Sequence, residues 1–327
     1  MVAAGTACLT ETTKRMQQFF GYMGTALLQV SMLAVLIAVG FAADKLSLYT
    51  KQTAVKTNDL LFYVITPAVI VHAFLTVEMT AENALGFLAA ALIAAVFHGM
   101  MSLVSLLLFR RKGEERAIFR YATVYGNVGY MGLPLAEAVA GEMGVFYCSA
   151  VVAVFNVFAF THGAAVMSGK GKGMSLKSIL INPGTIGIAI GLPLFLLNVS
   201  LPSVIAEPVG MIGSMNTPLA MLMFGTYLAN TDLVDMVKRR ENYAVALLKL
   251  VAAPLVFIVL LWACGVRGEL LLTAAVFASA PCANNTVMFA AKYGRDTGTA
   301  SKLCGFTTIL SVLTMPVSIA LAQTLGQ

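Results

Sequence analysis

The sequence predicts an all-α polytopic membrane protein with ten transmembrane helices. Three observations predict this fold class: the composition, the spacing of the apolar runs and the placement of the basic residues. The chain has 327 residues, of which 59% are hydrophobic and 11% are charged, and its mean hydropathy is +0.86. Soluble domains carry charges on about a quarter of their residues. This composition excludes an ordinary soluble domain.

Ten apolar runs divide the chain at regular intervals. A helix that crosses a hydrocarbon core of about 30 Å needs roughly 20 residues. The runs lie at residues 26–43, 57–76, 84–109, 117–139, 143–167, 184–197, 204–228, 243–263, 269–292 and 299–323. The sixth run is short. Residues 1–23 precede the first run, and we expect them to form an interfacial lead-in.

The basic residues alternate from one connection to the next. Of the 21 lysines and arginines, all but Lys14, Arg15, Lys249 and Arg267 fall in connections that follow odd-numbered runs. Loops rich in lysine and arginine stay in the cytoplasm. We therefore expect a multi-pass protein of the cytoplasmic membrane with both termini outside. Because the net charge of +6 lies in these loops, it does not indicate a nucleic-acid partner.

The polar connection at residues 168–183 divides the chain into two five-helix halves, at 24–167 and 184–327. An odd number of helices per half gives the halves opposite orientations. Three residue pairs recur in register between them: Thr66-Pro67 with Thr217-Pro218, His98 with Lys249, and Pro134 with Pro281. Weak internal symmetry of this kind is typical of transporters built from inverted repeats.

The fourth and ninth runs carry residues that interrupt a helix. The fourth contains Gly126, Asn127, Gly129, Gly132 and Pro134, and the ninth contains SAPCANNT at residues 279–286. Inside a helix, glycine costs about 1 kcal/mol and proline about 3 kcal/mol relative to alanine. We expect both helices to unwind there. The backbone groups that are freed must find partners in protein, water or a ligand.

Two such breaks predict a binding site for an anion. The half-helices present unpaired N–H groups and positive dipole ends near the middle of the membrane. Neighbouring amides and hydroxyls add hydrogen bonds without a permanent charge. The predicted substrate-binding residues are Asn127, Gly129, Pro134, Pro281, Asn284, Asn285 and Thr286. The alternative is that the glycines serve only close helix packing.

Four further polar residues within the runs are candidates for coupling or support. His98 and Lys249 would be costly to bury as charges. One interpretation is that they carry protons or act as counter-charges to the substrate. The other is that His98 is neutral with one hydrogen bond and that Lys249 extends to the cytoplasmic interface. For Lys249 we favour the second interpretation. Glu137 is placed to interact with a helix N-terminus, and we expect Asn156 to bridge helices.

Other function classes lack their required residues. The NVGY at residues 127–130 is similar to the TVGYG of potassium filters, but a filter needs four copies around an axis. The histidines form no HExxH, and the glycine-rich connection lacks the GxxxxGK[ST] spacing. We therefore expect no catalytic residues, no metal and no cofactor.

The two interrupted runs also carry a family resemblance. The segment NVGYMGLP at residues 127–134 resembles NTLVMGIP of plant PIN exporters, and AAKYG at residues 290–294, where the ninth run ends, resembles their AKEYN. LLFYVITPAVI in the second run is similar to bacterial members. The chain thus resembles the auxin efflux carrier family, which includes bacterial malate and malonate carriers, within the bile acid and arsenite transporter superfamily. The resemblance covers essentially all ten runs.

This resemblance implies an elevator mechanism. Helices 1, 2, 6 and 7 would form a scaffold, helices 3–5 and 8–10 would form the transport unit, and the fourth and ninth would cross at their breaks. It implies a homodimer. The expected substrates are mono- or dicarboxylates such as malate or malonate, or auxin-like weak acids; Glu137 and the short connection after the fifth helix depart from the plant pattern. A channel or sensor on the same fold is the alternative.

Overall fold

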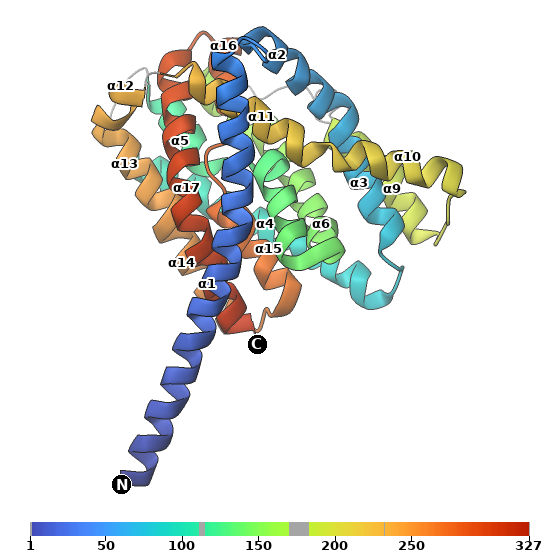
Figure 1. Cartoon of the computed structure of the whole chain (residues 1–327), viewed down its shortest axis with the longest axis vertical. Helices are drawn as coiled ribbons and strands as arrows, with labels where there is room; N and C mark the ends of the chain where they lie inside the picture. Colours follow the sequence, from blue (N-terminus) through green and yellow to red (C-terminus); the bar gives the residue numbers. More distant parts are fainter. Residues whose placement is uncertain (1, 111–114, 170–182, 232, 327) are drawn as a thin grey trace.

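The computed structural model describes residues 2–110, 115–169, 183–231 and 233–326. Helices account for nearly all of this part of the chain (Figure 1). In chain order the α-helices and π-helical turns (η) are α1 (Val2–Lys45), α2 (Lys51–Leu60), η1 (Leu61–Ile65), α3 (Thr66–Thr76), α4 (Ala81–Leu108), α5 (Arg116–Val124), η2 (Val128–Gly132), α6 (Leu133–Phe158), η3 (Ala159–Gly163), α7 (Ala164–Ser168), α9 (Pro183–Leu196), α10 (Ser203–Ser214), α11 (Asn216–Ala229), α12 (Leu233–Lys238), α13 (Arg240–Leu247), η4 (Leu248–Ala252), α14 (Ala253–Ala263), α15 (Gly268–Ser279), α16 (Asn285–Lys292) and α17 (Thr297–Gly326).

The prediction of an all-helical membrane protein is confirmed. The described residues form no named strand, and they include six helices long and apolar enough to cross a membrane. These six are Phe19–Lys45, Lys51–Thr76, Ala81–Leu108, Val128–Ser168, Arg240–Ala263 and Thr297–Gly326. Their outward faces carry exposed leucine and valine side chains, as expected for surfaces in contact with lipid.

The other predicted runs contain shorter helices. Residues 184–197 hold α9, and residues 204–228 hold α10 and α11. Residues 117–139 hold α5, an irregular segment at 125–127, and then η2 and the start of α6. Residues 269–292 hold α15, an irregular segment at 280–284, and α16. We name these two irregular segments the first crossover (125–127) and the second crossover (280–284).

Two helix limits bear on these predictions. The backbone of α1 is helical from Val2 through Lys45, so residues 2–23 are continuous with the first membrane helix. The Val128–Ser168 helix is in turn interrupted at Gly141, whose φ of 59° and ψ of −149° are non-helical. Only glycine adopts this region readily. The connection between the predicted fourth and fifth runs lies there.

Three prolines each follow a π-helical turn. The residue before the proline donates its N–H to the carbonyl five positions earlier: Thr66 to Leu61, Leu133 to Val128, and Ala253 to Leu248. The proline then occupies the first turn of the next α-helix, where its missing N–H costs little. The expectation that Pro134 unwinds its helix is therefore wrong. Its helix widens locally, and the break lies earlier, at residues 125–127.

Close backbone contacts join helices that are far apart in sequence. α1 runs beside α11 and α17 (Figure 1). A Cβ atom at Gly40 would lie 2.2 Å from the Leu222 carbonyl oxygen, and one at Gly225 would lie 2.1 Å from the Ile37 carbonyl oxygen. α3 packs on α9, where Gly191 meets the Phe74 ring. Small residues allow such close packing in membranes.

Candidate functional site

The two crossovers pair directly with each other. The Asn127 N–H donates to the Pro281 carbonyl oxygen at 2.7 Å, and the Ala283 N–H donates to the Tyr125 carbonyl oxygen at 3.0 Å. Together these bonds form an antiparallel bridge between Gly126 and Cys282. The backbone groups that the two breaks leave without intrahelical partners thus hydrogen-bond to one another. Such pairing is needed because lipid offers no hydrogen bonds at this depth.

The Asn127 side chain begins the helix that follows the first crossover. Its Oδ1 accepts the Tyr130 N–H at 3.3 Å, which is the role of an N-cap residue. The Asn127 carbonyl oxygen accepts the N–H groups of Met131 and Gly132. Asn127 is 4% exposed, so its backbone and its Oδ1 are fixed by this turn.

At the second crossover a hydroxyl from α17 supplies the partner. The Thr307 Oγ1 accepts the Cys282 N–H at 3.1 Å and itself donates within α17 to the Leu303 or Cys304 carbonyl. The Cys282 Sγ donates to the Ala122 carbonyl oxygen in the last turn of α5, at 3.3 Å. The second crossover is therefore held between α17 and the end of α5.

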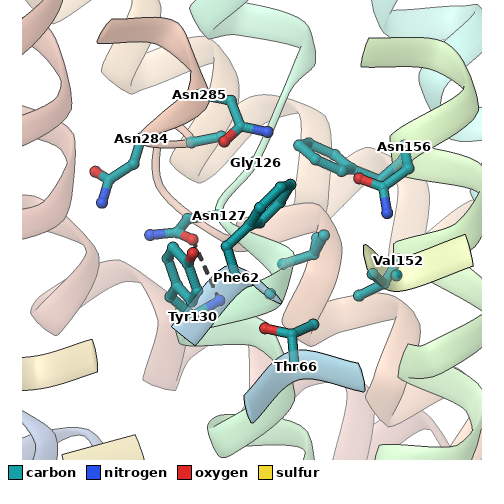
Figure 2. A pocket seen from close by; sticks show the side chains of 14 residues that line it. Phe62, Thr66, Gly126, Asn127, Tyr130, Val152, Asn156, Asn284 and Asn285 are labelled. Atoms are coloured by element: carbon teal, nitrogen blue, oxygen red, sulfur yellow. Dashed lines mark hydrogen bonds between the residues drawn. The ribbon is translucent and has the colours of Figure 1, made fainter. Parts of the chain in front are cut away.

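A cavity of about 50 Å³ lies beside the bridge. Figure 2 shows it surrounded by side chains from both crossovers and from the surrounding helices. Its walls are Phe62 and Thr66 of η1 and α3, residues 126–130, Val152, Phe155 and Asn156 of α6, Gly184 of α9, and residues 283–285. None of these residues is charged. At roughly 10–15 Å³ per water molecule, such a volume holds only a few waters or a small polar group.

Three residues that line the cavity each have a buried polar atom without a hydrogen-bond partner among the described residues: Thr66 Oγ1, Asn127 Nδ2 and Asn284 Nδ2. Leaving a buried polar group unpaired costs about 1–3 kcal/mol. Two of the three atoms are amide nitrogens, which only donate. Both nitrogens are enclosed beside the cavity, whose wall also carries the amide side chains of Asn156 and Asn285.

The structure brings together five of the predicted site residues and separates the others. Asn127, Gly129, Asn156, Asn284 and Asn285 line the cavity. Asn156, which we expected to bridge helices, faces it (Figure 2).

The remaining predicted residues lie elsewhere. Pro281 contributes its carbonyl to the bridge rather than to the wall, and Thr286 is fully buried behind it. Pro134 and Glu137 line a different cavity of about 150 Å³, bordered by α3, α6, α10 and α11. Because that cavity lies beyond the π turn η2, these two residues are separated from Asn127.

The expectation that the Lys249 side chain extends to the cytoplasmic interface is wrong. Its side chain is fully buried, and its Nζ lies 3.4 Å from the carbonyl oxygens of Thr123 and Val124, at the end of α5. His98 is also buried, and its Nδ1 lies 2.7 Å from the Ala94 carbonyl oxygen of its own helix. The His98 ring packs against Tyr125 and Phe158.

Sequence reasoning missed the aromatic part of the cavity wall. Phe62, Tyr130 and Phe155 look like ordinary apolar or packing residues in their helices, so no local pattern identifies them. Thr66 carried a signal, because Thr66-Pro67 recurs in the second half of the chain. Tyr130 also links the first crossover to α2, since its hydroxyl donates to Asn58 Oδ1 at 3.3 Å.

A polar network ties helix ends together near the basic loops. Arg239 pairs with Glu115 at 2.8 Å, and the Thr299 hydroxyl donates to Glu115 or to Asp296. The hydrogen bond from Thr299 lowers the pKa of Asp296, and the hydrogen bond to Glu115 raises the pKa of Arg239. Within the described residues, no group of three or more His, Cys, Asp or Glu is placed to hold a metal ion.

Comparisons with known proteins all point to membrane transporters. The family model described as a membrane transport protein matches residues 25–178 and 170–319. A protein of Rhizobium meliloti named "Putative malonate transporter" is 26% identical over 230 residues, which cover 67% of this chain and 71% of that protein. An "Uncharacterized transporter" of Methanocaldococcus jannaschii is 25% identical over 214 residues, 61% of this chain and 68% of that protein.

Proposed function

The chain belongs to the membrane transport protein family, and from this premise we propose that it is a secondary transporter of small organic anions, mono- or dicarboxylates, with its substrate site in the cavity at the crossovers. The observation that carries the proposal is the cavity wall itself. It combines asparagine amides from both breaks with aromatic and apolar surface and has no carboxylate. Such a wall favours a carboxylate oxygen, because a carboxylate accepts hydrogen bonds and brings its own charge.

We further propose that the ten predicted helices form a 5+5 inverted repeat that works as an elevator. In this proposal the cavity lies between the scaffold and the transport unit. Thr66 of α3 and Gly184 of α9 belong to the proposed scaffold, whereas Asn156 and the crossovers belong to the proposed transport unit. Support for the scaffold group comes from the close contacts of α1 with α11 and of α3 with α9. A sliding transport unit would carry both crossovers, and hence the substrate, as one body.

The proposed location is the cytoplasmic membrane, with the basic loops inside and both termini outside, and the proposed assembly is a homodimer. The loop charges support the orientation. The homodimer rests on the family resemblance. Cysteine labelling of Gln17→Cys, in the first helix, from outside intact cells tests the orientation, and cross-linking in native membranes tests the dimer.

The central experiment is uptake into proteoliposomes. Malonate is the first substrate to test, because the name of a relative contains it. We expect saturable uptake and counterflow, which distinguish a carrier from a channel. Asn127→Ala and Asn285→Ala should abolish uptake while the protein still inserts, and Asn230→Ala, which changes an asparagine bonded to Asp44 outside the cavity, should retain it. Full uptake by both cavity variants would refute the site.

A further inference from the structure

Lys249 places one positive charge directly behind the cavity wall. A Cβ atom at Gly126, a wall residue, would lie 3.4 Å from the Lys249 Nζ. The lysine enters from η4, a helix that contributes nothing to the wall itself. Its ammonium therefore lies against the backbone of the first crossover, at a residue that lines the cavity.

No described carboxylate lies within ion-pairing distance of Lys249. The ion pairs among the described residues join Arg239 to Glu115 and Lys302 to Asp235, both near the loops. The titratable groups that interact electrostatically with Lys249 are His98 of α4 and Cys282 of the second crossover. Neither of these side chains is an acid that carries a fixed negative charge.

The end of α5 stabilises this charge in part. The carbonyl groups at a helix C-terminus carry the equivalent of about half a negative charge, and Lys249 lies against those of Thr123 and Val124. Burying a cation within a membrane protein is costly unless it is paired or wetted. Part of the positive charge at the crossover thus remains without a partner among the described residues.

We propose that Lys249 is the fixed counter-charge of the substrate and that the site accepts one negative charge. The inference rests on the proposed function and narrows its substrate class. The wall itself contains no cation, so Lys249 behind it would compensate one carboxylate charge and a second would enter the cavity uncompensated. A monocarboxylate binds as its anion, and a dicarboxylate binds with one carboxyl group protonated.

The test compares three probes on the purified full-length protein: malonate, its monomethyl ester and malonamide, which carry two, one and no ionisable carboxyl groups. Dissociation constants are measured by calorimetry from about pH 5 to about pH 7. We expect monomethyl malonate to bind equally well throughout. Malonate should bind about tenfold more weakly for each pH unit above its second ionisation, and malonamide should bind poorly at every pH.

Variants then connect the charge preference to Lys249. Lys249→Met should weaken the binding of monomethyl malonate at least tenfold and remove its preference over malonamide. Lys302→Met, which changes a lysine paired near the loops, should leave the affinities for both compounds unchanged. If Lys249→Met fails to fold, the wild-type pH profiles decide. Binding of malonate that does not change with pH, or a folded Lys249→Met with wild-type affinities, would overturn the inference, leaving Lys249 as a structural partner of α5. Absence of any carboxylate binding or uptake by the wild type would instead overturn the proposed function, and the inference with it.

Discussion

At the first crossover a buried ammonium group, Lys249, lies against the helix that ends there, whereas at the second the additional partner is a neutral hydroxyl, Thr307. The sequences of the two crossovers also differ. The first crossover contains glycine and is followed by an asparagine-capped turn, and the second contains proline and no glycine. Two breaks that pair with each other through their backbones can therefore have different electrostatics. The positive charge is on one side of the pair.

The largest expected effect tests how tightly the crossovers are packed. A Cβ atom at Gly126 would lie 3.3 Å from the Cβ and the carbonyl oxygen of Ala280, atoms that cannot rotate away. We expect Gly126→Ala to lower the free energy of unfolding by about 1–3 kcal/mol, the range for overpacking. Mild denaturation with SDS measures it. Gly129→Ala is the control, because its Cβ would meet nothing within 4 Å, and equal stability of the two variants would contradict this packing.

A smaller loss is expected at the hydroxyl of the second crossover. Thr307→Val keeps the shape of the side chain but leaves the buried Cys282 N–H without an acceptor, which costs about 2 kcal/mol. Thr314→Val is a matched change, since that hydroxyl only donates within its own helix to the Leu310 carbonyl. The same SDS unfolding experiment applies. If the two valine variants were equally stable, Thr307 would not hold the crossover.

Alanine variants of two cavity asparagines, Asn127 and Asn284, should differ in stability, although both variants should reduce substrate uptake. Asn127 caps η2 through its Oδ1, whereas the Asn284 side chain makes no capping bond to α16. We expect Asn127→Ala to cost about 1 kcal/mol and Asn284→Ala to leave stability unchanged. Thermal unfolding without substrate measures both variants. Equal melting temperatures would show that the capping bond contributes nothing.

The smallest effect concerns acid, which should act on the loops and not on the crossovers. Neither crossover contains an acidic residue. The pKa of Asp296 is lowered in the folded state by the Thr299 hydroxyl, so its stabilisation is complete above the unfolded value of about 3.9 and is lost as the pH falls through the folded pKa. Asp296→Asn should flatten the decline of the melting temperature at low pH. A decline as steep as in the wild type would assign acid sensitivity to other groups.

Much of the fold was predictable because lipid imposes simple rules on a sequence. Apolar length and loop charge alone predict a polytopic helical protein, and the residues around Asn127 and Pro281 identified the family, whose membership is confirmed. The limits of the breaks were not predictable. Pro134 has the chemistry of a helix breaker, but a π turn accommodates it, and nothing local in the sequence distinguishes a widened turn from an unwound one.

The cavity was predictable only in part, for a similar reason. Asn127, Asn284 and Asn285 were identified because polar residues next to glycine or proline are unusual within apolar runs. Phe62 and Phe155 could not be identified, because an aromatic residue in a membrane helix gives the same sequence signal whether it faces lipid, another helix or a cavity. Gly184 lies on the wall only because α9 packs against α3.

The sequence by itself determined that this chain is helical, crosses a membrane and interrupts two of its helices, because hydropathy, charge and backbone preference are properties of each residue and its neighbours. Tertiary structure alone decided that the interruptions pair with each other, that Thr307 completes the second, and that Lys249 lies at the first instead of extending to the surface. These contacts join residues more than a hundred positions apart or on separate helices, and their hydrogen bonds form only when packing brings the donors and acceptors together.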